Sequence, residues 1–308
     1  MANFSDRDGW IWLDGEMLPW REAKTHVLTY SLHYGVGCFE GVRAYETADG
    51  PAIFRLREHT DRLLNSAKIL GMPCSWSAEV LDQAQHAVIR DNALKQAYLR
   101  PMMFYGSEGM GLRAEGLKTH VMVAAWPWGN YLGESAMLKG IRVRTASFSR
   151  HHVNSAMCRA KANGQYIVAS MALNEVLKDG YDEALMLDTQ GFVAEGSAEN
   201  IFLVKDGQLH TPDVTACLDG ITRKTIIKLA EDFGLKVFER RITRDEVYVA
   251  DEAFFTGTAA EVTPIREVDN RAIGNGGRGP VTERLQAAYL AAVKGQAPAY
   301  RHWLSLVR

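Results

Sequence analysis

The sequence predicts an α/β protein of two domains, and three observations support this. Its 308 residues are enough for two compact domains or one large one, since a single hydrophobic core usually stops growing at about 250–300 residues. Strand-like runs recur between helical runs that carry apolar residues at i, i+3, i+4 and i+7. The aromatic, glycine-containing stretch WPWGNYLGES interrupts both patterns. We therefore expect a small α+β domain at residues 1–126, a connection at residues 127–136 and a large domain at residues 137–308.

The first domain should begin with a strand in GWIWLDGE. The alternating run CFEGVRAYET follows, with a hairpin turn at Asp49 and Gly50. RLREHTDRLLNSAKILG places its leucines near one helical face, and Gly71 ends that helix. Ser77 is the predicted cap of a second helix, on which Val80, Ala84 and Val88 form a stripe. AYLRPMMFYG and KTHVMVAAW then predict two apolar strands.

The second domain should open with a strand in GIRVRTASF and a helix in GQYIVASMALNEVLKDG that Gly180 closes. EALMLDTQGFVAEGSAENIFLVKDGQLHT indicates a strand meander, with turns at residues 189–191 and at Asp206 and Gly207. Two amphipathic helices follow in GITRKTIIKLAEDFG and GPVTERLQAAYLAAVKG, the second with Pro280 in its first turn.

Composition narrows the class of protein. A formal net charge of −2 and 23% charged residues give no electrostatic reason to expect a nucleic-acid partner. The N-terminus lacks a signal-peptide pattern and no run approaches the roughly 20 apolar residues of a membrane span, so we expect a cytoplasmic protein. The four cysteines are far apart in the sequence, which favours free thiols.

Two segments carry groups suited to catalysis. In MCRAKANGQYI, Lys161 lies between two alanines, whose small side chains let another molecule approach its amine closely. Taken alone, the same pattern is also typical of an ordinary lysine at the front of a helix. VAEGSAENIF places Glu195 and Glu199 on a strand-like run, and the alternative there is a polar turn between strands.

Two further segments are suited to binding an anion. CLDGITRKTI places Gly220, Ile221 and Thr222 at the start of a helix, where free N–H groups favour a phosphate, although they also suit simple capping. FFTGTAAEVTP puts Thr256 and Thr258 after an apolar strand, where the alternative is a strand-ending turn. A lysine, an acid and two N–H-rich turns are together the parts needed to hold pyridoxal 5′-phosphate.

These residues carry a family resemblance. EGSAENIF, followed by LHT and LDGITR, resembles the signature of the class IV pyridoxal-phosphate aminotransferases. The segments LHYGVGCFEGVRAY, FRLREHTDRL, YLRPMMFYGSEGMG, AAWPWGNYLG and TGTAAEVTPI look like those of bacterial branched-chain amino acid aminotransferases, so the resemblance covers nearly the whole chain. It implies a two-domain fold type IV, D-amino acid aminotransferase-like structure, whose large domain carries the cofactor lysine and whose site lies between the domains.

The resemblance also implies an activity and a cofactor site. The chain is expected to transfer the amino group of leucine, isoleucine or valine to 2-oxoglutarate, and back, through pyridoxal and pyridoxamine phosphate. Lys161 matches the catalytic lysine that binds the cofactor and moves the proton, and Glu195 matches the partner of the pyridinium nitrogen. Asn200 either contacts the cofactor or braces Glu195. The remaining residues that match the cofactor site are Arg62, Tyr166, Leu218, Gly220, Ile221, Thr222 and Thr258.

The matching substrate site combines an apolar part with a charged part. Its residues combine aromatic and apolar side chains with one arginine: Tyr34, Phe39, Tyr98, Arg100, Met110, Leu112, Trp128, Tyr131, Thr258 and Ala259. Arg100 is expected to meet the carboxylate of glutamate, while the aromatic side chains accept aliphatic substrates. The family implies a homodimer at least, with a hexamer as the larger alternative, in which Tyr34 and residues 110–112 reach the neighbour's pocket.

Alternatives of other classes remain open at this stage. Another fold type IV enzyme, such as an aminodeoxychorismate lyase or a D-amino acid aminotransferase, would use the same lysine, and a non-catalytic binder would keep the phosphate site alone. The stretch YLRP with GMG nearby favours the branched-chain enzyme. His151 and His152 are adjacent and lack accompanying ligands, so we expect no metal site. Cys38 and Cys217 flank the motifs without the spacing of a redox pair.

Overall fold

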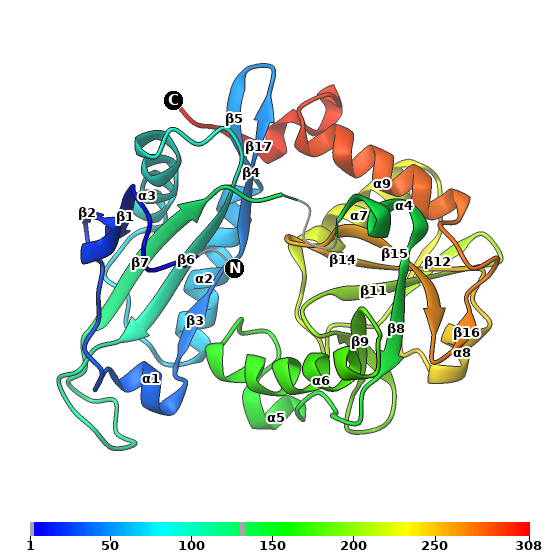
Figure 1. Cartoon of the computed structure of the whole chain (residues 1–308), viewed down its shortest axis with the longest axis horizontal. Helices are drawn as coiled ribbons and strands as arrows, with labels where there is room; N and C mark the ends of the chain where they lie inside the picture. Colours follow the sequence, from blue (N-terminus) through cyan, green and yellow to red (C-terminus); the bar gives the residue numbers. More distant parts are fainter. Residues whose placement is uncertain (1–2, 130–132) are drawn as a thin grey trace. The chain divides into compact units, whose positions relative to one another are not determined.

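The computed structural model describes residues 3–129 and 133–308, which form two compact units (Figure 1). Unit 1 comprises Met1–Trp128, Ala160–Gly164 and Val293–Arg308, and unit 2 comprises Gly129–Arg159 and Gln165–Ala292. Among the described residues, every helix is too short or too polar to span a bilayer.

Two segments that the sequence prediction assigns to the second domain pack in unit 1 instead. Strand β17 (Leu304–Leu306) pairs antiparallel with β5 (Gly50–Phe54), which ties the C-terminus to unit 1. Ala162, next to Lys161, forms an antiparallel bridge with Cys38. Both attachments are backbone pairings between residues far apart in the sequence, so local patterns carry no sign of them. The predicted boundary around residues 127–136 stays a prediction.

Unit 1 is built on one sheet with helices packed against it. Its other strands are β1 (Trp10–Leu13), β2 (Glu16–Pro19), β3 (Gly37–Phe39), β4 (Val42–Thr47), β6 (Ala97–Tyr105) and β7 (Thr119–Trp126). The sheet order is β17-β5-β4-β6-β7-β1-β2, and β3 also pairs with β6. Its helices are α1 (Tyr30–Tyr34), α2 (Leu56–Ile69) and α3 (Ala78–Asp91), with 3-10 turns at Trp20–Glu22 and Pro298–Trp303.

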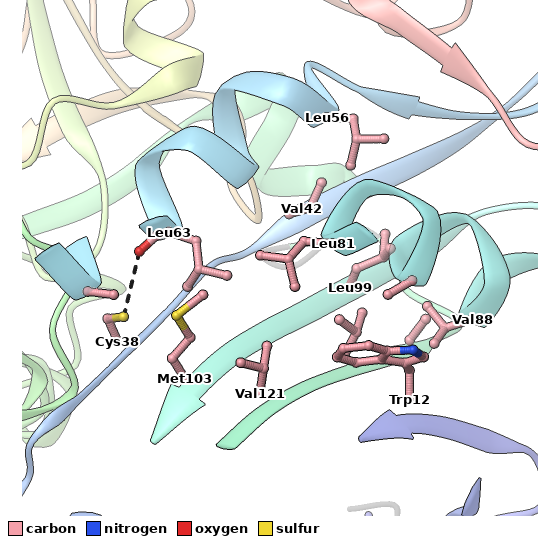
Figure 2. Close-up of a cluster of buried hydrophobic side chains, with 14 of the residues drawn as sticks. Trp12, Cys38, Val42, Leu56, Leu63, Leu81, Val88, Leu99, Met103 and Val121 are labelled. Atoms are coloured by element: carbon pink, nitrogen blue, oxygen red, sulfur yellow. Dashed lines mark hydrogen bonds between the residues drawn. The ribbon is translucent and has the colours of Figure 1, made fainter. Parts of the chain in front are cut away.

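The core of unit 1 forms where α2 and α3 pack on this sheet. Figure 2 shows Leu63 of α2 and Leu81 and Val88 of α3 meeting Leu99 and Met103 of β6. Full burial of such a side chain contributes roughly 1.5–3 kcal/mol. The Cys38 thiol lies 3.8 Å from the carbonyl oxygen of Leu63, so β3 also packs against α2.

Helix α3 confirms one sequence prediction and corrects another. Ser77 caps the helix, because its Oγ accepts the Val80 N–H at 3.4 Å. The predicted stripe is wrong at Val80, which is exposed, whereas Leu81 is buried beside Ala84 and Val88. Residues 81, 84 and 88 lie at i, i+3 and i+7 and therefore share one helical face.

A change of strand partner positions the residues that follow β3. Phe39 pairs with Met102 of β6, while Val42 of β4 pairs with Leu99 of the same strand. Glu40 and Gly41 lie between these pairings, and the Glu40 N–H donates to the Pro101 carbonyl oxygen at 2.8 Å. Proline has no N–H for a ladder, so its position at this change of partner is consistent with its chemistry.

Unit 2 contains a mixed sheet. Its strands are β8 (Ile141–Thr145), β9 (Glu183–Leu187), β10 (Val193–Gly196), β11 (Asn200–Lys205), β12 (Gln208–Thr211), β13 (Val237–Glu239), β14 (Glu252–Gly257), β15 (Glu261–Val268) and β16 (Arg271–Ala272). The order is β10-β9-β8-β15-β14-β11-β12-β13, and β16 pairs with β15. The pairs β8 with β9, β8 with β15 and β12 with β13 are parallel, and the others are antiparallel. Parallel and antiparallel pairing together confirm the α/β class with α+β features.

The described helices of unit 2 include the three that the sequence predicted, which begin close to the expected places, and three short ones that it did not predict. They are α4 (Glu134–Lys139), α5 (Val153–Ala156), α6 (Tyr166–Lys178), α7 (Ile221–Asp232), α8 (Arg244–Tyr248) and α9 (Pro280–Val293), and a 3-10 turn at Asn163–Gln165 precedes α6. The turn at Asp206 and Gly207 is confirmed, with φ of 49° and 70°, which the tight hairpin of β11 and β12 requires.

Candidate functional site

The backbone of Lys161 is held at both of its polar groups within unit 1. Its N–H donates to the Ser66 Oγ on α2 at 3.0 Å, and its carbonyl oxygen accepts the Phe39 N–H at 3.1 Å. The flanking residues Ala160 and Ala162 are buried, as the small-neighbour pattern suggested. These contacts fix the point from which the Lys161 side chain extends.

The Phe39 ring is in contact with the charged ends of two side chains, those of Lys161 and Arg100. The Lys161 Nζ lies 5.1 Å from the centre of the Phe39 ring, and the Arg100 guanidinium carbon lies 4.5 Å from it. Such contacts are worth about 0.5–2 kcal/mol each. Arg100 Nη2 also donates to the Tyr98 hydroxyl at 3.2 Å. Its buried Nε has no hydrogen-bond partner among the described residues, so this arginine keeps a donor for a carboxylate.

Tyr98 belongs to an aromatic cluster. Its ring centre lies 5.0 Å from that of Trp128 and 5.3 Å from that of Trp126. A Cβ at position 41 would lie 2.0 Å from the Tyr98 hydroxyl oxygen, so Gly41 is required for this approach. Tyr131, another predicted substrate residue, lies outside the described residues.

The residues predicted to serve a neighbouring subunit are exposed on this chain. The Tyr34 hydroxyl accepts the Gly111 N–H at 3.1 Å, which holds α1 against the loop that carries Met110 and Leu112. The exposed fractions are 37% for Tyr34, 51% for Met110 and 85% for Leu112. Apolar side chains this exposed are unusual for a surface that meets only water.

Arg62 belongs to a buried charge cluster that sequence reasoning missed. Its Nε and Nη2 donate to the two Glu40 carboxylate oxygens at 2.6 and 2.9 Å. His59 Nδ1 donates to the same carboxylate at 2.7 Å. Burial alone would raise the pKa of Glu40, but Arg62 and His59 outweigh burial and hold that pKa below its usual range. The carboxylate therefore stays ionised in the interior.

In unit 2, Glu195 is a buried carboxylate at the end of β10. Arg150 Nη2 lies 2.9 Å from its Oε1, and both side chains are about 6% exposed. The Leu218 N–H donates to Oε2 at 3.2 Å. Asn200 Nδ2 donates to the Leu218 carbonyl oxygen at 2.9 Å and lies 3.5 Å from Glu195 Oε2. The bracing role of Asn200 is therefore the better supported, and Arg150 is a further residue that sequence patterns did not indicate.

The N-terminus of α7 is suited to a phosphate. Gly220 occupies the cap position, and no side chain among the described residues caps the helix there. The first N–H groups, including those of Ile221 and Thr222, are donors that lack partners within the helix. A Cβ on Gly220 would lie 2.0 Å from the Asn200 Oδ1, so only glycine permits this packing.

Three further predicted residues lie in unit 2. Thr258 and Ala259 are half-buried in the turn between β14 and β15. Tyr166 is half-buried at the first residue of α6.

Among the described residues, the cysteines are free thiols and His152 caps a helix. All four cysteines are free among the described residues. Burial, with a contribution from Glu40, raises the pKa of the Cys38 thiol to about 12, and burial also raises the pKa of Cys217. His152 Nδ1 accepts the Asn154 N–H at 3.2 Å and so caps α5. In the described part of the chain, no group of three or more His, Cys, Asp or Glu could hold a metal ion.

Comparisons with known proteins agree with this arrangement. Residues 37–268 match the family model for amino-transferase class IV. The branched-chain-amino-acid aminotransferase of Pseudomonas aeruginosa is 62% identical over 306 residues, covering 99% of this chain and 100% of that protein.

Two solved structures of a T.th. branched-chain amino acid aminotransferase are also similar. The complex with 4-methylvaleric acid has a TM-score of 0.94 at 46% identity, and the complex with N-(5′-phosphopyridoxyl)-L-glutamate has a TM-score of 0.95 at 46% identity. Each comparison covers 98% of this chain and 99% of the other. The predicted family is confirmed: this chain belongs to the class IV aminotransferases.

Proposed function

We propose that this chain is a pyridoxal-phosphate-dependent branched-chain aminotransferase. It transfers the amino group of L-leucine, L-isoleucine or L-valine to 2-oxoglutarate, reversibly and by a ping-pong mechanism. The single observation that carries the proposal is the Phe39 ring in unit 1, because the Lys161 amine and the Arg100 guanidinium both lie over it. An amine and a guanidinium beside one apolar ring support the roles proposed for Lys161 and Arg100.

The donors and acceptors of the chain fit the cofactor. The uncapped N-terminus of α7 supplies N–H groups for a phosphate, and the buried Glu195 carboxylate supplies an acceptor for a pyridinium N–H. Arg62, Ile221, Thr222 and Thr258 are the proposed phosphate ligands, while Tyr166 and Leu218 are the proposed contacts of the ring. When bound, pyridoxal phosphate supplies an electron sink for the electrons released at the substrate α-carbon.

Lys161 is the proposed catalytic residue. Its amine would take the proton from the substrate α-carbon and pass it to the cofactor carbon C4′, so it must lie within reach of both carbons. The contacts of the Lys161 backbone with Ser66 and Phe39 limit the positions that the amine can reach. Such restraint contributes to catalysis, because a proton carrier works within hydrogen-bond reach.

The substrate pocket must accept two kinds of side chain. Tyr98, Phe39 and Trp128 offer apolar surface to an aliphatic side chain, whereas Arg100 offers a charged donor to the side-chain carboxylate of glutamate. The T.th. relative binds both 4-methylvaleric acid and a glutamate derivative. We infer that this chain likewise binds both a branched aliphatic substrate and glutamate.

A homodimer is the proposed smallest assembly, with a hexamer as the larger alternative. An apolar groove of about 300 Å³ lies on unit 1, and its lining includes Leu32, Met102, Phe104 and Met122. Val27, Leu28 and Leu32 nearby in the sequence are exposed, as are Tyr34 and residues 110–112. A second copy of the chain would cover this apolar surface. The free thiols support the proposed cytoplasmic location, because thiols persist in reducing compartments.

A coupled assay tests the proposed reaction. The purified protein, loaded with pyridoxal phosphate, is incubated with L-leucine and 2-oxoglutarate, and the glutamate formed is measured. We expect glutamate from L-leucine, L-isoleucine and L-valine, and little from D-leucine. Turnover of D-leucine alone would identify a D-amino acid enzyme, and pyruvate release from aminodeoxychorismate would identify a lyase.

A further inference from the structure

The cluster of Glu40, His59 and Arg62 has no assigned role beyond the proposed contact between Arg62 and a phosphate. Glu40 is fully buried, His59 is 2% exposed and the Arg62 side chain is 14% exposed. Removing a carboxylate from water is costly, and a buried ion pair seldom adds net stability over apolar packing. A cluster of this kind therefore calls for an explanation other than stability.

The geometry of the pair restricts the guanidinium. Arg62 donates through Nε and Nη2 to the two oxygens of Glu40, at 2.6 and 2.9 Å. The guanidinium is planar, so fixing its Nε and Nη2 edge also fixes the direction in which Nη1 projects. A single hydrogen bond would leave the group free to rotate.

Glu40 itself is anchored from two directions. Its backbone N–H donates to the Pro101 carbonyl oxygen on β6, and His59 Nδ1 donates to its Oε2 from α2 at 2.7 Å. The carboxylate thus has a fixed position relative to both the sheet and the helix of unit 1. Any group that it holds takes its orientation from the core of that unit.

The same helix connects Arg62 to Lys161. Ser66 lies one turn after Arg62, and its hydroxyl donates to the Arg62 carbonyl oxygen at 2.8 Å. The same oxygen of Ser66 accepts the Lys161 N–H at 3.0 Å. Arg62 and Lys161 are therefore both restrained at the same turn of α2. Glu40 holds the guanidinium of Arg62, and Ser66 holds the backbone N–H of Lys161.

We propose that Glu40 is a positioning residue that orients the Arg62 guanidinium toward the cofactor phosphate and so sets the preference for a phosphorylated cofactor. This rests on the proposed function, in which Arg62 binds that phosphate. Glu40 acts through Arg62 and touches neither cofactor nor substrate. Its removal should weaken binding of the phosphate while leaving contacts with the pyridine ring intact.

The test compares two ligands that differ only in the phosphate. The full-length apoprotein is titrated with pyridoxal 5′-phosphate and, separately, with pyridoxal, and the dissociation constants are measured by absorbance and fluorescence. Glu40→Gln should weaken binding of the phosphorylated ligand by roughly 10- to 150-fold, the range for a hydrogen bond to a charged group, and binding of pyridoxal by little. Glu40→Asp keeps the charge but shortens the side chain, and it should give the same selective loss if Glu40→Gln fails to fold.

A matched control lies on the same helix. Glu58 pairs with Arg55 at 2.8 Å, and Glu58→Gln removes an ion pair from α2 without touching Arg62. This variant should bind both ligands as the parent protein does. If the Glu40 variants weakened both ligands equally, or neither, the positioning role would be overturned.

A second variant separates the inference from the proposed function. Arg62→Met should also weaken binding of pyridoxal phosphate relative to pyridoxal. If Arg62→Met showed no such selectivity, the phosphate assignment would be wrong and the role of Glu40 would fall with it. If Arg62→Met were selective and the Glu40 variants were not, only the inference about Glu40 would fail.

Discussion

Each unit buries a carboxylate against an arginine, but the two pairs are held differently. In unit 1, side-chain donors contact both oxygens of Glu40 at 2.6–2.9 Å. In unit 2, Arg150 contacts one oxygen of Glu195 at 2.9 Å, while the other oxygen meets the Leu218 N–H at 3.2 Å and the Asn200 amide at 3.5 Å. Hydrogen bonds from neutral donors at these distances are weaker than charge-assisted ones.

We interpret this difference as two distinct roles of a buried carboxylate. Both oxygens of Glu40 accept hydrogen bonds from other side chains, so its removal should change the orientation of the Arg62 guanidinium. Glu195 meets a ring nitrogen in the proposed function, so its removal should change the chemistry itself. Variants in the two units should therefore separate cofactor affinity from reaction rate.

The largest expected effect concerns Lys161. Lys161→Ala removes both the amine that bonds to the cofactor and the proton carrier, so turnover with leucine should fall by about 10⁴-fold or more. Borohydride reduction followed by peptide mass mapping should find no cofactor on the variant. Lys205→Ala, which breaks a surface pair with Asp251, is the control and should retain activity. Cofactor on a different lysine of the parent protein would contradict the assignment.

The next prediction tests the comparison directly. Glu195→Gln keeps the shape of the side chain but removes its charge, and the leucine half-reaction should slow by roughly 100- to 1,000-fold, the cost of losing one preorganised electrostatic group. Stopped-flow absorbance measures this rate at saturating cofactor. Glu40→Gln under the same conditions should slow it far less. Equal slowing in both variants would show that the two carboxylates do not differ in use.

Arg100 should distinguish the two substrates. Arg100→Met keeps an unbranched side chain but removes the charged donor, so the half-reaction with glutamate should lose roughly 10- to 150-fold and that with leucine much less. Single-turnover rates for each substrate measure the two losses separately. Arg57→Met, which removes an arginine paired with Asp82, is the control. Equal losses for both substrates would place the contact at the carboxylate that they share.

The smallest expected effect is on stability at acidic pH. Burial lowers the pKa of His59 below its ordinary value of 6.5, although Glu40 opposes this shift and Arg62 and Lys161 add to it. The unfolded chain therefore binds a proton below about pH 6.5 that the folded chain does not, so stability should fall as the pH falls through that window. One unit of pKa shift corresponds to about 1.4 kcal/mol.

Denaturant titrations between pH 7.5 and 5 measure this dependence. His59→Gln should flatten the loss of stability over that range, because glutamine can still donate to Glu40 but does not titrate. His26→Gln, the same replacement at an exposed histidine, is the matched control variant. An unchanged slope in His59→Gln would assign the acid sensitivity to other groups.

The fold follows from local patterns where neighbours in sequence decide the structure. The cap at Ser77, the hairpin at Asp206 and the start of α7 are all confirmed, because each depends on a few adjacent residues. The attachment of residues 160–164 to unit 1 could not be predicted, because it depends on a pairing of Cys38 with Ala162.

The candidate site shows the same limit. The reactive residues were found because the class IV motifs resemble a known family, and that family is confirmed, while their individual roles stay predictions. Arg150 and Glu40 were missed because the residues next to a charged side chain in the sequence do not indicate which distant residue it will pair with in the folded chain. Val80 was misplaced for a related reason, since the helix period alone does not say which of two neighbouring apolar residues faces the core.

Gly41 has a consequence for how much sequence change the chain tolerates. A Cβ there would meet the Tyr98 hydroxyl, and the Tyr98 ring is restrained because it packs against both Trp126 and Trp128. A saturation library at position 41 should therefore return glycine from any selection for growth on branched-chain substrates. If a larger residue were recovered with bulkier or smaller substrates, position 41 would set the size of the proposed substrate pocket without any change to the side chains proposed to line it.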